Sequence, residues 1–125
     1  MDRVLKVLLG LISLPLLGGG LAIMFAPESM AAKTHVLPDG VVGLNSIRGA
    51  IGGLLVGSGA MLVTGLVRKN TQWFLAVAVM MAAVTVGRGV GLVVDGFAAD
   101  SLRPFIAEIV IVTLTVIAHK RWGND

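Results

Sequence analysis

The chain has 125 residues, of which 56% are hydrophobic and only 14% are charged. A soluble domain carries about 25% charged residues, so this composition indicates a protein of the lipid bilayer and excludes an ordinary soluble domain. The chain has no cysteine, which excludes disulfides, thiolate metal sites and a thiol nucleophile, and its net charge of +3 comes without the basic, aromatic-rich patch of a nucleic-acid-binding protein.

Four apolar segments follow one another along the chain, at residues 4–25, 41–67, 73–94 and 102–118. Each is near the length of about 20 residues that a helix needs to cross the bilayer. The first follows Arg3 and Lys6, as in a signal peptide, but its apolar run is longer than the usual signal, which favours an uncleaved helix. The runs are continuous rather than alternating, so barrel strands are not expected. The sequence predicts an all-α, integral membrane, up-down four-helix bundle that forms one transmembrane domain over residues 1–125.

Helix-breaking residues separate the segments. We expect Ala26-Pro27-Glu28 to end the first helix and Leu37-Pro38-Asp39-Gly40 to form a turn before the second. Arg68-Lys69-Asn70 separates the second helix from the third. Asp100 or Ser101 is expected to cap the fourth helix, with Pro104 in its first turn.

Lysine and arginine are distributed unequally between the two ends of the spans. Six fall on the side of the chain termini and two fall in the opposite loops, namely Arg3, Lys6, Arg68, Lys69, Lys120 and Arg121 against Lys33 and Arg103. By the positive-inside rule, both termini are predicted to be cytoplasmic, in a multi-pass protein of the cell inner membrane. Trp73 and Trp122 are expected at the same cytoplasmic interface.

Glycines recur at four-residue spacing in the second and third spans. The glycines expected to pack helices together are Gly49, Gly53, Gly57, Gly87 and Gly91. Small residues at this spacing let helix backbones approach closely in lipid. The same faces also suit a homo-oligomer or a larger membrane complex, and this alternative stays open.

Two opposite charges are expected to meet in the outer half of the bundle. Arg88 lies seven residues before Asp95, and Glu108 lies seven residues after Ser101, so both are about 10 Å deep at 1.5 Å per residue. Helical side chains lean toward their own N-terminus, so Arg88 leans inward and Glu108 leans outward. Glu108 is therefore the predicted counter-charge of Arg88.

A second arginine is expected at the same level. Arg48 lies about two turns into the second span, with Asn45 one turn above it on the same helical face. Arg48 leans outward and Asp95 leans inward, which predicts a second ion pair nearer the surface.

These residues suggest a site for an amphipathic anion in the outer-leaflet half, such as a lipid headgroup, a fatty acid or a polyprenyl phosphate. Arg48 and Arg88 would hold the anion, Asn45 would orient it, and Glu108 would pair with Arg88 or act on a proton. An enzyme with Glu108 or Asp95 as general base is conceivable, but no motif demands it, and no catalytic residue is assigned.

Two other functions compete with this hypothesis. A structural or accessory subunit would use the Arg88–Glu108 pair only to hold the bundle or an oligomer together. A transporter of small anions or other solutes ranks third, because the cytoplasmic half of each span has few polar residues. No metal and no cofactor is expected, since His35 and His119 lie at opposite ends of the spans and neither belongs to a metal-ligand motif.

Three stretches carry a resemblance to a known family. "LNSIRGAIGG", "VGRGVGLVVDG" and "FIAEIVIVTL" resemble a domain-of-unknown-function family of small bacterial four-helix inner-membrane proteins, and the shape is more remotely similar to the DoxX-like proteins. The family has no established activity, so the resemblance implies the fold and a residue set, but no substrate. Carried onto this chain, that set is Asn45, Arg48, Gly49, Arg88, Asp95, Gly96 and Glu108.

Overall fold

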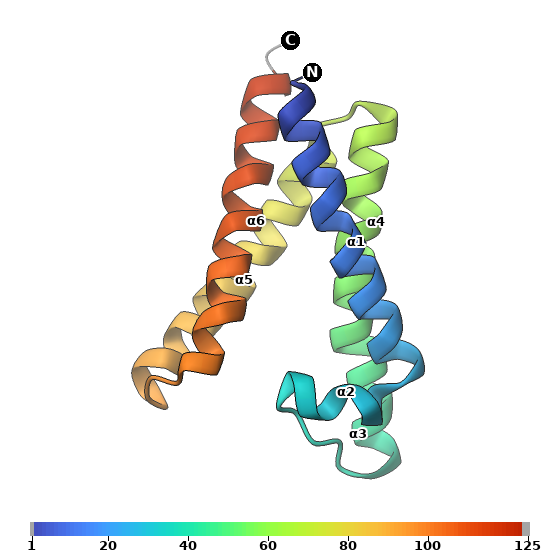
Figure 1. The fold of residues 1–125 in the computed structure, drawn as a ribbon, viewed down its shortest axis with the longest axis vertical. Coiled ribbons are helices and arrows are strands. Elements are labelled where there is room, and N and C mark those ends of the chain that lie inside the picture. Colours follow the sequence, from blue (N-terminus) through green and yellow to red (C-terminus); the bar gives the residue numbers. More distant parts are fainter. Residues whose placement is uncertain (1, 124–125) are drawn as a thin grey trace.

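The computed structural model describes residues 2–123 and consists of helices joined by short connections. In chain order they are α1 (Arg3–Phe25), α2 (Pro27–Thr34), α3 (Gly40–Ser46), the π-helix η1 (Ile47–Gly52), α4 (Gly53–Arg68), α5 (Gln72–Val94) and α6 (Ala99–Gly123). α3, η1 and α4 follow one another without a break, so four helices are long and apolar enough to cross a membrane. They pack up and down, as Figure 1 shows, and the predicted fold class is confirmed.

The bounds of the first three spans agree with the sequence prediction to within one residue at each end. The fourth helix is longer than the predicted 102–118, because it begins at Ala99 and continues to Gly123. Asp100 therefore lies inside its first turn, and the prediction that Asp100 or Ser101 caps this helix is wrong. Lys120 and Arg121 form its last turn, where positive charge suits the negative end of the helix dipole, so the helix outlasts its apolar run.

A short helix that the sequence analysis missed follows α1 directly. Ala26 leaves the helical conformation, with φ −138° and ψ 59°, so α1 ends at Phe25 as predicted. Pro27 then occupies the first turn of α2, where its missing N–H removes no hydrogen bond. Glu28 in the first turn and Lys33 in the last turn both suit the helix dipole. Residues 26–28 thus end one helix and begin the next.

The helices form two pairs that meet at one end of the molecule. α1 packs on α4 and η1, and α5 packs on α6, while smaller contacts join α4 to α5 and α1 to α6. In Figure 1 the pairs lie together at the end that holds both termini and diverge toward the end that holds α2 and α3. The core cluster consists of Leu5, Leu9, Leu16, Leu62, Phe74, Val77, Met81, Ala118 and Trp122.

At the end that holds the termini, an aromatic contact joins α5 to α6 and a charged contact joins the two helix pairs. The rings of Phe74 and Trp122 pack edge to face, with their centroids 5.6 Å apart. Trp122 is only 7% exposed, so its indole packs against the neighbouring helices in the last turn of α6. The Arg121 guanidinium lies 3.3 Å from the Asp2 carboxylate, which links the end of α6 to the start of α1.

The glycines that bring helices together differ from the predicted ones. A methyl group at Gly49, Gly53, Gly57 or Gly87 would meet no atom within 4 Å, and one at Gly91 would meet only the Asp95 side chain. The prediction that these glycines pack the helices of one chain together is therefore wrong. The tight contacts occur instead at Gly20, Gly52, Gly59 and Gly65, where a methyl group would come within 2.8 Å of a neighbouring helix.

The four-residue spacing identified a helical face, but not the face that meets α1. Gly53 and Gly57 lie in α4 and Gly87 lies in α5, so each set follows the period of a regular α-helix. Gly52 and Gly59, which do meet α1, also share one face at a spacing of seven residues. Spacing alone therefore does not distinguish the packed face from the open one.

Candidate functional site

The predicted ion pair between the third and fourth spans is present. Arg88 Nε donates a hydrogen bond of 2.7 Å to Glu108 Oε1, which confirms the predicted counter-charge. The Glu108 side chain is 12% exposed and the Arg88 side chain is 42% exposed. Glu108 Oε2 is buried and accepts no hydrogen bond from residues 2–123. The pair therefore joins α5 to α6 through one of the two carboxylate oxygens.

Arg48 does not join that pair. Its Nη1 donates a hydrogen bond to the main-chain carbonyl of Met24 in α1. The last carbonyls of a helix lack partners within the helix, and positive charge is favoured there. Arg48, supplied by η1, therefore closes the C-terminal end of α1.

The predicted ion pair between Arg48 and Asp95 is wrong. Asp95 caps the end of α5 through its main-chain N–H, which donates to the Gly91 carbonyl at 2.8 Å. Its exposed carboxylate forms no ion pair with any residue of the described range. Asn45 is exposed in α3 and makes no hydrogen bond through its side chain within residues 2–123. The structure therefore divides the predicted polar layer between the two helix pairs.

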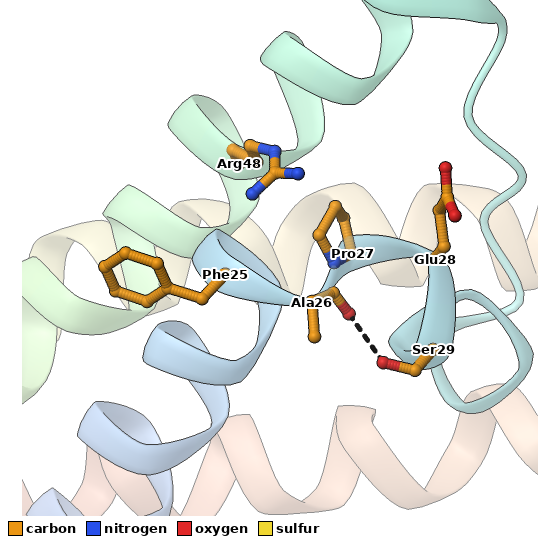
Figure 2. Close-up of a pocket in the computed structure, with 6 residues that line it drawn as sticks. All are labelled: Phe25, Ala26, Pro27, Glu28, Ser29 and Arg48. Carbon is orange, nitrogen blue, oxygen red and sulfur yellow. Dashed lines mark hydrogen bonds between the residues drawn. The ribbon is translucent and has the colours of Figure 1, made fainter.

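A pocket of about 360 Å³ lies beside Arg48, where α1 gives way to α2. Its lining residues are Phe25, Ala26, Pro27, Glu28, Ser29 and Arg48. In Figure 2 the Arg48 guanidinium and the Glu28 carboxylate lie on the same side of α2, with the Pro27 ring between them. The Ser29 hydroxyl points to the other side and donates to the Ala26 carbonyl at 3.1 Å.

The sequence analysis did not select Glu28, although a signal for it was present. An acidic residue directly after a proline is typical of the first turn of a helix. This signal indicates that a helix begins at residue 27. Where one helix ends and another begins at once, side chains of both helices lie close together.

A second, smaller pocket of about 230 Å³ lies between α5 and α6. Its lining residues are Ala82, Thr85, Val86, Ile109, Val112 and Thr113. The hydroxyls of Thr85 and Thr113 donate to carbonyls of their own helices, at 2.7 and 2.8 Å. The walls therefore present apolar groups to a ligand, which suits a hydrocarbon chain and provides no reactive group.

Neither histidine lines either pocket, and each contacts a polar group elsewhere. His119 Nδ1 is 3.1 Å from the Thr71 carbonyl, near the chain termini. His35 Nε2 is 4.0 Å from Asp100 Oδ2, at the opposite end. Between residues 2 and 123 no three side chains of the metal-binding kind come together. The described residues therefore offer no metal site at either histidine.

Comparison with known proteins gives a family. Residues 4–119 match the family described as Domain of unknown function (DUF4345). The chain belongs to this family. The predicted membership in a domain-of-unknown-function family is thereby confirmed over most of the chain. No curated protein and no solved structure matches the chain. The DUF4345 match accordingly identifies the family and supplies no substrate.

Proposed function

We propose that this DUF4345 protein is a small integral membrane protein that binds an amphiphile through its anionic group, with Arg48 as the binding residue. The position of the Arg48 guanidinium at the wall of the 360 Å³ pocket carries this proposal. Arginine has five N–H donors, and the contact with Met24 uses Nη1. The remaining donors suit the two oxygens of a carboxylate or phosphate.

The surroundings of the pocket suit an amphiphile rather than a free ion. Phe25 is 78% exposed and ends the long apolar helix α1, so it offers a surface for a hydrocarbon chain. Arg48 and Glu28 follow at the level where the apolar run stops. A ligand with a charged head and an apolar tail matches this change in polarity.

The ligand-binding role of Arg88 is revised in this proposal. Its Nε is bound to Glu108, and the pair belongs to the other helix pair. The same observation favours a second candidate function, in which the Arg88–Glu108 pair is a structural element of an accessory subunit. The two candidates differ in which arginine a ligand requires.

A binding measurement tests the proposal. Delipidated protein in detergent is titrated with dioleoylphosphatidylglycerol, and bound lipid is counted by native mass spectrometry. Arg48→Gln should weaken binding about tenfold, because hydrogen bonds to charged groups contribute about 1.5–3 kcal/mol. Arg103→Gln is the matched control, since Arg103 is an exposed arginine outside both pockets. Equal binding by the two variants would refute the proposal.

We also propose that the termini are cytoplasmic in the inner membrane of a bacterium, which places the pocket in the outer leaflet. Six of the ten lysines and arginines lie at the end of the molecule that holds the termini. Green fluorescent protein fused after Gly123 should fluoresce, and alkaline phosphatase fused there should be inactive. Phosphatase inserted after Val36 should be active. The reverse pattern of activities would contradict this orientation.

A further inference from the structure

Opposite charges line the Arg48 pocket. Glu28 lies in the first turn of α2 and Arg48 lies in η1, and both line the same cavity. Within residues 2–123 they form no ion pair with one another, and Glu28 forms none with any other residue. An anionic headgroup on Arg48 would therefore have an uncompensated carboxylate beside it. A ligand that carries one charge of each sign would neutralise both the Arg48 guanidinium and the Glu28 carboxylate.

The backbone between the two charges is held in place. Pro27 is buried and stands at the first position of α2, where its ring fixes φ. On the other side, Arg48 is held by its bond to the Met24 carbonyl. Figure 2 shows the guanidinium and the carboxylate on either side of the Pro27 ring, with Phe25 at the opposite end from Glu28. The pocket thus presents a cationic group, an anionic group and an apolar side chain at defined places.

We infer that this pocket binds the headgroup of a zwitterionic phospholipid of the phosphoethanolamine type. The phosphate contacts Arg48, the ammonium group contacts Glu28, and an acyl chain lies along Phe25. This inference rests on the proposed function and names its ligand class. A primary ammonium donates three hydrogen bonds, which suits a carboxylate. A quaternary ammonium donates none and is typically bound by several aromatic rings, whereas Phe25 is the one aromatic residue that lines this pocket.

A competition experiment tests this selectivity. Delipidated protein is mixed with equal amounts of dioleoyl phosphatidylethanolamine, phosphatidylcholine and phosphatidylglycerol, and bound lipids are counted by native mass spectrometry. The wild type should prefer phosphatidylethanolamine to phosphatidylglycerol by about tenfold, the same factor that is expected for the loss of one charge-assisted contact in Arg48→Gln. Glu28→Gln should remove or reverse this preference. Asp39→Asn, which neutralises an exposed carboxylate outside the pocket, should leave it unchanged.

The outcomes separate this inference from the proposed function. If Glu28→Gln leaves the lipid preference unchanged while Arg48→Gln lowers the binding of all three lipids, the inferred selectivity for a zwitterionic headgroup is wrong and the proposed function stands. If Arg48→Gln changes the binding of none of the three lipids, both the inferred headgroup and the proposed function are wrong. Soluble glycerophosphoethanolamine should compete poorly, because it lacks the acyl chains. Competition equal to that of the lipid would show that the ligand is a free phosphodiester instead.

Discussion

Glu108→Met should destabilise the protein by about 3 kcal/mol, because removing the buried partner of a half-buried ion pair leaves the other charge without compensation. Arg88 Nε now donates at 2.7 Å to Glu108 Oε1, and arginine does not lose its proton in proteins. Arg88 lies in a helix long and apolar enough to cross a membrane, where a charge without a partner is costly. The free energy of unfolding in mixed micelles, followed by helical circular dichroism during titration with sodium dodecyl sulfate, measures the effect.

Two double variants serve as controls for this prediction. Arg88→Met with Glu108→Met should return to within about 1 kcal/mol of the wild type, since apolar residues often replace a buried pair without loss. The exchanged pair, Arg88→Glu with Glu108→Arg, should also recover stability. A single Glu108→Met variant as stable as the wild type would show that the pair does not hold α5 to α6. If lipid binding also required the wild-type orientation of the pair, Arg88 would be a ligand residue after all.

Hydropathy and length predicted the four spans because a bilayer imposes both on every helix that crosses it. The ends of the first three spans follow from charged and turn residues such as Arg68 and Pro38. The end of the fourth span did not follow, because α6 continues through the polar residues Lys120 and Arg121. Hydropathy indicates which part of a helix lies in lipid. It does not indicate where the helix ends, because the backbone can stay helical beyond the apolar part.

The Arg88–Glu108 pair was predictable because both residues lie on regular helices that one short connection joins. Arg48 was misplaced because it belongs to the helix pair that contains α1, whereas Asp95 ends α5 of the other pair, and the two pairs diverge at that end. Sequence spacing does not reveal this divergence. The packing glycines were misplaced because spacing does not show which helical face meets α1, and that face carries Gly52 and Gly59 rather than Gly49, Gly53 and Gly57.

Gly20→Ala should destabilise the pairing of α1 with α4 by about 2 kcal/mol, which is within the range for overpacked sites. A methyl group at Gly20 would lie 2.7 Å from the Val56 main-chain nitrogen and 3.0 Å from the Gly52 carbonyl oxygen. Main-chain atoms of a helix cannot rotate away as a flexible side chain does, so the two helices must separate. Separation would also pull Met24 from Arg48, so phospholipid binding at the Arg48 pocket should fall along with stability.

Gly19→Ala is the matched control, because it makes the same change one residue earlier in α1, where a methyl group meets no atom within 4 Å. It should be neutral or slightly stabilising, since alanine favours a helix over glycine by about 1 kcal/mol. Sodium dodecyl sulfate unfolding and native mass spectrometry of bound phospholipid measure both effects on the same samples. Equal stability of the two variants would show that the close approach of α1 to α4 does not hold this helix pair together. If Gly20→Ala lowers stability but leaves phospholipid binding unchanged, the Arg48 pocket does not depend on the packing of α1 against α4.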